Sequence, residues 1–155
     1  MRRLILLLLL LLTARPGFAE PRLGEADVRA FVARQEQAWN AGALDRYFAA
    51  FTPDARFTDQ AYVGDKPPVP YGTSTLTQAR LQAGKSRSGA KPQEAGRILR
   101  IALTPDGHTA RVESSVVSRV GARRLCATRV QTLILAHGTL RSRGQTDTYI
   151  RCRRG

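Results

Sequence analysis

Two polar side chains in the first half of the sequence fall in segments that are otherwise patterned for burial. Gln35 lies on the apolar stripe of a helix predicted over residues 25–41. Asp59 follows Phe57 at the two-residue spacing of one strand face, so an inward Phe57 implies an inward Asp59. A buried amide without a partner costs about 1–3 kcal/mol, so Gln35 needs a hydrogen-bond partner or faces a cavity. An interior carboxylate has the chemistry of a general base.

Two further polar side chains lie on the apolar face of a predicted hairpin. If Gly121-Ala122 is a two-residue turn, Arg129 lies opposite Ser114 and Gln131 lies opposite Val112. That face also carries all three leucines of the second strand, Leu125, Leu133 and Leu135, which marks it as the inner face. A guanidinium is unusual in such surroundings, because buried charges are almost always paired. The register therefore predicts an interior cluster of polar groups.

The elements that position these groups can be predicted from periodicity and turn signals. Helices are predicted over residues 25–41, 44–51 and 73–83. A loop is predicted over 64–71 and a flexible connection over 84–96. Strands are predicted over residues 55–59, 97–103, 109–120, 123–136 and 139–152. The last four strands form a long antiparallel meander.

Two cysteines, Cys126 and Cys152, are predicted to form a disulfide, with two buried free thiols as the alternative. If His137-Gly138 is the turn of the last hairpin, Cys126 faces Tyr149 and the two cysteines point to opposite faces. One bulge at Gly144 would restore the match. Their separation excludes a CxxC redox pair, and the sequence has no metal-ligand spacing. No metal or cofactor is predicted.

The first 19 residues have the pattern of a secretory signal peptide. Two arginines follow Met1, nine aliphatic residues run from Leu4 to Leu12, and small residues precede a cleavage position after Ala19. A membrane span needs about 20 apolar residues, so a retained anchor is disfavoured. We therefore expect a cleaved leader over 1–19, one domain over 20–155, a periplasmic or secreted location, and no transmembrane span.

The charge of the chain is large and uneven. The sequence carries 25 basic and 12 acidic side chains, and residues 76–155 hold 16 of the basic and 4 of the acidic ones. In an exported chain, the expected polyanionic partner is an anionic envelope surface rather than a nucleic acid. The alternative is that arginine simply covers solvated strand faces.

The segment WNAGALDRYFAAFTPDARFTD, residues 39–59, carries a resemblance to a known superfamily. Together with the order of helices, short strand, helix and meander, it resembles the nuclear transport factor 2-like superfamily, which includes SnoaL-like polyketide cyclases and ketosteroid isomerase. The resemblance covers nearly all of residues 25–152. It implies an α+β fold in which a cone-shaped, curved antiparallel sheet wraps on N-terminal helices and encloses a ligand pocket.

The resemblance also implies roles for individual residues. Asp59 matches the proton-shuttling aspartate of ketosteroid isomerase, and Gln35 and Gln131 stand where that enzyme has acidic oxyanion-hole donors. Amides donate more weakly to an oxyanion, so the same chemistry would be slower here. A base at Asp59 needs a raised pKa, whereas a nearby Arg129 would lower it.

Three functions remain open on these grounds. In the first, an internal pocket binds a small, partly apolar ligand whose acidic group Arg129 favours. In the second, the chain is a SnoaL-like isomerase, cyclase or hydrolase that uses Asp59. In the third, it is an interaction module that forms a homodimer through the outer sheet face. The residues expected to line the pocket are Gln35, Trp39, Tyr47, Arg129 and Gln131, although Trp39 and Tyr47 also fit simple core packing. A side-chain-filled interior would favour the third function.

Overall fold

The computed structural model of the chain describes residues 21–86 and 91–152. The helices are α1 (Glu25–Ala41), α2 (Leu44–Ala49) and α3 (Leu76–Ser86). The strands are β1 (Phe51–Ala61), β2 (Val69–Thr75), β3 (Gln93–Leu103), β4 (Thr109–Val120), β5 (Arg123–Ala136) and β6 (Thr139–Ile150). The predicted leader over 1–19 lies outside the described residues. Within those residues, no helix is both long and apolar enough to cross a bilayer.

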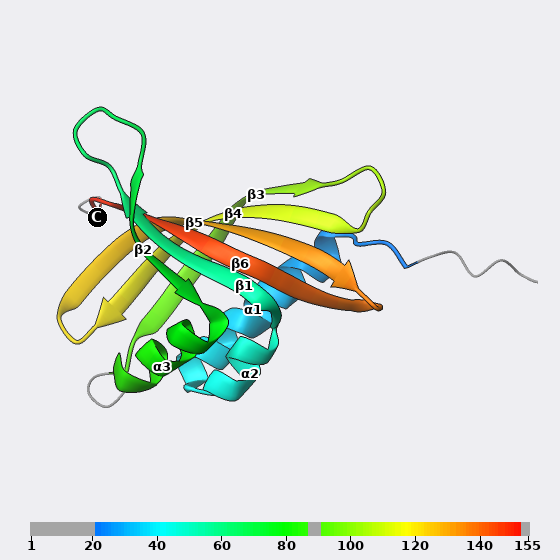
Figure 1. Ribbon diagram of the computed structural model, residues 1–155, viewed down its shortest axis with the longest axis horizontal. Coiled ribbons are helices and arrows are strands. Elements are labelled where there is room, and N and C mark those ends of the chain that lie inside the picture. Colours follow the sequence, from blue (N-terminus) through cyan, green and yellow to red (C-terminus); the bar gives the residue numbers. More distant parts are fainter. Residues whose placement is uncertain (1–20, 87–90, 153–155) are drawn as a thin grey trace, which may run out of the picture.

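The six strands form one curved sheet in the order β2-β1-β6-β5-β4-β3, and the helices lie on one side of it (Figure 1). This is the predicted α+β cone. One expectation needs correction, because the sheet is mixed and not wholly antiparallel. β1 pairs in parallel with β6, since the long excursion through β2, α3 and the meander brings the chain back in the same direction.

The register of the β4–β5 hairpin is the predicted one, with Arg129 opposite Ser114 and Gln131 opposite Val112. In the β5–β6 hairpin the pairing shifts by one residue between Gln131 and Leu133. Gly144 lies in this bulge with a φ of 142°. A Cβ at Gly144 would collide with the backbone oxygen of Arg56 in the neighbouring strand, so glycine is required there.

The bulge determines the position of the cysteines. Beyond it, Cys126 lies opposite Ile150 instead of Tyr149. Cys126 and Cys152 form a disulfide with their Cα atoms 5.2 Å apart. The predicted disulfide is therefore present, and it is made possible by the one-residue shift in the last strand.

The edges of the sheet are where the sequence prediction was wrong. β2 occupies residues predicted as a loop and the start of a helix, and β3 begins inside the predicted connection. Prolines marked the loop, but Pro70 is tolerated in β2 because that strand lies at the edge of the sheet. β1 is also longer than predicted, since it starts at Phe51 directly after the shorter α2.

Two apolar clusters form the core on the inner face of the sheet. One joins α1 to β4 and β5 and is built around Phe31, Val112 and Leu133. The other joins α2 and α3 to β1 and includes Ala38 of α1. Gln35 lies between Phe31 and Ala38 along α1, so the polar interior begins where the two apolar clusters separate.

Candidate functional site

The first part of the site is a pair of buried amides between α1 and β5. Gln131 donates a hydrogen bond from Nε2 to Oε1 of Gln35 at 3.0 Å. Both side chains are buried, as predicted. The Nε2 group of Gln35 has no hydrogen-bond partner in the described part of the chain. The amide pair thus makes one hydrogen bond, and the Nε2 group of Gln35 remains a buried donor without an acceptor among the described residues.

The second part is an arginine held by two acids. Arg129 donates to both carboxylate oxygens of Asp147, from Nε and Nη2 at 2.7 Å each, and from Nη1 to Oε2 of Glu94 at 2.9 Å. The side chains of Arg129, Glu94 and Asp147 are only 14%, 13% and 10% exposed. Burial would lower the pKa of Arg129, but the charges of Asp147 and Glu94 hold that pKa well above its usual value. Arg129 is therefore always charged in the interior, and its planar guanidinium group presents two parallel N–H donors to the carboxylate of Asp147.

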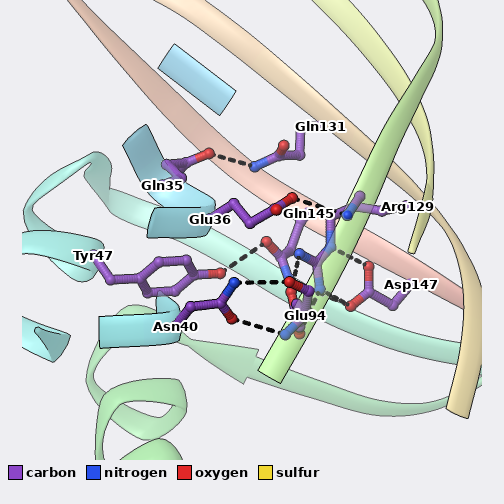
Figure 2. A network of polar contacts seen from close by, with 10 residues as sticks. Gln35, Glu36, Asn40, Tyr47, Glu94, Arg129, Gln131, Gln145 and Asp147 are labelled. Atoms are coloured by element: carbon purple, nitrogen blue, oxygen red, sulfur yellow. Dashed lines mark hydrogen bonds and ion pairs between the residues drawn. The ribbon is translucent and has the colours of Figure 1, made fainter. Parts of the chain in front are cut away.

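Aromatic side chains extend the cluster toward α2. The hydroxyl of Tyr47 donates to Oε1 of Gln145 at 3.2 Å, and Gln145 donates from Nε2 to Asp147 at 3.4 Å (Figure 2). Burial raises the pKa of Tyr47, so its hydroxyl stays protonated. The ring of Trp39 lies 5.0 Å from that of Tyr47 in a tilted arrangement. Both rings pack in the interior, and Tyr47 also donates its hydrogen bond to Gln145.

The position of Glu94 depends on the C-terminal end of α1. Asn40 donates from Nδ2 to the carbonyl of Glu94 at 2.7 Å and accepts from its amide at 2.8 Å (Figure 2). Two residues further along β3, the amide of Gly96 donates to Glu36 at 2.9 Å. β3 is an edge strand, so these α1 side chains satisfy backbone groups that no further strand pairs with. Asn40 therefore positions one of the two acids that hold Arg129.

Little space remains inside this cluster. A cavity of about 30 Å³ is bounded by its side chains, including Gln35, Tyr47, Glu94, Arg129 and Gln131. Such a volume holds about one or two water molecules. Four of the five side chains predicted to line a ligand pocket bound this small cavity, and Trp39 does not. Gln35 also borders an open cleft of about 300 Å³ between α1, α2 and the start of β6.

Asp59 lies outside the cluster. It is exposed at the open end of the inner face, where it is the neighbour of Asp147 across the β1–β6 pair. Partial burial and the charge of Asp147 raise the pKa of Asp59, and a hydrogen bond from Tyr149 opposes the shift. The inward positions of Asp59 and Arg129 in the sequence pattern predict one interior cluster that contains both. This prediction is wrong for Asp59, because the acids that pair with Arg129 are Asp147 and Glu94.

Three members of the cluster were missed in the sequence. The predicted bulge at Gly144 was a sufficient signal for two of them, since the one-residue shift places Asp147 opposite Arg129 and Gln145 opposite Gln131. No sequence pattern indicated an interior position for Glu94, because residues 84–96 were predicted to be a flexible connection.

No protein-family model matches the chain, and no curated protein matches it. Solved structures do match it. An NTF2-like protein of unknown function from Shewanella oneidensis is 12% identical with a TM-score of 0.64, over 81% of this chain and 99% of that one. A ketosteroid isomerase-like protein from Erwinia carotovora is 13% identical with a TM-score of 0.60, over 82% and 96%. The β subunit of a putative aromatic-ring-hydroxylating dioxygenase from Novosphingobium aromaticivorans is 18% identical with a TM-score of 0.64, over 83% and 90%.

These structures define the class of the protein. Two of them are named as an NTF2-like and a ketosteroid isomerase-like protein, and this chain shares their α+β cone over most of its length. The chain therefore has the NTF2-like fold that its sequence resembles.

Proposed function

We propose that this chain is an assembly module that forms a homodimer through the outer face of its sheet, and that its interior polar cluster stabilises the fold. The observation that carries the proposal is the charge pattern of that outer face. The centre of the face holds no charged side chain, although the chain has 25 basic and 12 acidic residues.

The neutral area extends across β1, β6 and β5. Thr58, Thr146 and Val130 form one cross-strand row, and Gln60, Thr148 and Thr128 form the next. We call these six residues the neutral patch; Thr148 is buried and the other five are half-buried. The helices lie on the opposite side of the sheet, so none covers it (Figure 1). Charged side chains begin at its margin, with Arg56 on β1 and Glu113 on β4.

A neutral, β-branched surface of this kind fits a second copy of the same chain. Two copies repel each other through most of their surface, because the chain from Glu20 onward carries 22 basic and 12 acidic side chains. The cores of protein interfaces are depleted in charged residues, and a two-fold interface uses the same patch on both subunits. The dioxygenase β subunit among the similar structures is, by its name, a component of a larger assembly.

Sedimentation equilibrium of the chain starting at Glu20 tests the proposal. The wild-type chain is expected to be a dimer, and Thr146→Arg is expected to make it a monomer by placing a charge in the neutral patch. Thr77→Arg, at an exposed position of α3, is the matched control and should remain dimeric. A monomeric wild-type chain, or a dimer that tolerates Thr146→Arg, would contradict the proposal.

A ligand in the interior is a second candidate, favoured by the unpartnered Nε2 of Gln35. An acidic ligand would have to displace Glu94 or Asp147 from Arg129, because the existing cavity is too small for it. Native mass spectrometry of protein purified from its host would reveal such a ligand as a discrete added mass that Arg129→Met removes.

Proton transfer by Asp59 is a third candidate, favoured by its raised pKa and its exposure. An isomerisable β,γ-unsaturated ketone is a suitable probe. Turnover by the wild-type chain that Asp59→Asn abolishes would establish the activity, and equal rates with both chains would exclude this role.

Export is part of the same proposal and rests on the N-terminal sequence. Protein isolated from its native host should begin at or near Glu20 when its N-terminus is sequenced. An intact Met1 would show that the leader is retained.

A further inference from the structure

The β1–β2 hairpin exposes a group of large apolar side chains. Tyr62, Val63, Val69 and Tyr71 are 57%, 62%, 49% and 64% exposed. They make up half of the eight large apolar side chains that are exposed in the described part of the chain. Single exposed apolar residues are ordinary, but four on one projecting hairpin mark an interaction surface.

The β4–β5 hairpin concentrates positive charge. Arg119 and Arg124 lie directly opposite each other across the strands, and Arg123 adjoins the turn. Arg151 follows the end of β6. All four are exposed, and none has an ion-pair partner among the described residues. Like charges directly opposite each other destabilise a hairpin, so the fold gains nothing from this arrangement.

Both hairpins and the end of β6 reach the same end of the molecule, at the left of Figure 1. The Cys126–Cys152 disulfide ties the end of β6 to β5, and Sγ of Cys152 lies 3.9 Å from the carbonyl oxygen of Arg124. The arginines of the two segments are therefore held together by a covalent link. We call the four apolar residues and the four arginines the end surface.

We propose that the end surface docks the protein on a membrane of anionic phospholipid. Tyrosine and valine side chains on a projecting hairpin can enter the region between headgroups and acyl chains, where tyrosine is favoured. Arginines at the same end of the molecule can bind headgroup phosphates, because the planar guanidinium group donates two parallel hydrogen bonds. The tip of the apolar hairpin contributes no net charge, because Asp65 and Lys66 are adjacent, so the attraction comes from the arginines.

The combination of both features selects a lipid surface over other polyanions. A nucleic acid or an acidic polysaccharide would use the arginines but would leave the four apolar side chains in water. The end surface is also separate from the neutral patch, so this inference does not depend on dimer formation.

Vesicle co-sedimentation of the chain starting at Glu20, which contains every described element, tests the inference. The probe is a vesicle of phosphatidylcholine mixed with phosphatidylglycerol, with phosphatidylcholine alone as the uncharged comparison. We expect binding to the mixed vesicles that high salt weakens, and little binding to phosphatidylcholine. Replacing Arg123 and Arg124 together by Gln should lower the partition coefficient about 25-fold, at about fivefold for each arginine.

Matched variants separate the end surface from general charge and general apolarity. Tyr62→Ser with Val63→Ser should lower partitioning about tenfold, whereas Leu81→Ser, equally exposed on α3, should not change it. Arg97→Gln with Arg100→Gln, on β3, is the charge control. Circular dichroism melting confirms that each variant is folded.

Three outcomes would overturn the inference. One is vesicle binding that the Arg123 and Arg124 substitutions leave unchanged. Another is an equal loss in the β3 control, which would mean diffuse charge attraction. The third is binding to heparin or duplex DNA without binding to mixed vesicles.

Discussion

Asp147 and Asp59 are direct neighbours across the β6–β1 pair, yet they lie in two different regions of the molecule. Asp147 is buried, and both of its carboxylate oxygens accept hydrogen bonds from Arg129. Asp59 is one strand nearer to the sheet edge, exposed to solvent, and has a raised pKa. Two aspartates in neighbouring strands of one sheet face therefore differ in role. Asp147 stabilises the fold because Arg129 and the helices enclose it, whereas Asp59 remains open to solvent.

The largest loss of stability is expected when the cation that pairs with Asp147 is removed. Arg129→Met leaves Glu94 and Asp147 as unpaired interior acids, so it should lower the free energy of unfolding by about 3–5 kcal/mol. Urea denaturation followed by circular dichroism measures this. Arg29→Met breaks an exposed ion pair with Glu25 and should cost less than about 1 kcal/mol. Equal losses in the two variants would show that Arg129 is not held as described.

Two double-mutant cycles measure how strongly each aspartate is coupled to Arg129. The cycle of Asp147→Asn with Arg129→Met should give a coupling energy of at least about 1 kcal/mol, because the side chains share two hydrogen bonds. The cycle of Asp59→Asn with Arg129→Met should be additive within about 0.5 kcal/mol. Strong coupling to Asp59 would return that residue to the interior cluster.

The amide pair provides an intermediate case. Gln131→Leu removes the donor to Gln35 and leaves its Oε1 unpaired, which should cost about 1–3 kcal/mol. The double substitution of Gln35 and Gln131 by Leu should cost less than Gln131→Leu alone, because neither side chain then carries a buried polar atom that needs a partner. A double variant that is less stable than the single one would show that the amides have further partners. Thermal and urea unfolding of the two variants and the wild-type chain decide between these outcomes.

The smallest expected effect is at Asp59, and it has the opposite sign. A raised folded pKa means that the fold disfavours the ionised carboxylate, so Asp59 costs stability above that pKa and the cost disappears as the pH falls below the unfolded value. Asp59→Asn should therefore stabilise the protein at neutral pH, by no more than about 0.5 kcal/mol because solvent screens an exposed charge. The gain should vanish in strongly acidic buffer. Melting temperatures across pH measure this, and a loss of stability at neutral pH would contradict it.

Much of the meander could be predicted because turn type and strand register are local properties. Gly121-Ala122 is enough to place Arg129 opposite Ser114, and the requirement that two cysteines meet is enough to predict the bulge at Gly144. The edge strands could not be predicted in the same way. β2 contains Pro70 and β3 begins in a polar segment, and both are strands only because neighbouring chain satisfies one side of their backbone.

The sequence by itself determined which side chains of α1 and β5 face the interior, because periodicity and pairing register record this directly. The fold class was implied by the resemblance of residues 25–152 to a known superfamily, and the disulfide was predicted because the chain has two cysteines and an expected exported location. Only the tertiary structure decided which acids neutralise Arg129 and how much space they leave. Glu94 reaches Arg129 because Asn40 of α1 binds the backbone of β3, a contact between residues 54 positions apart. Pairings over such distances depend on how helices and sheet close on each other, which no local pattern records.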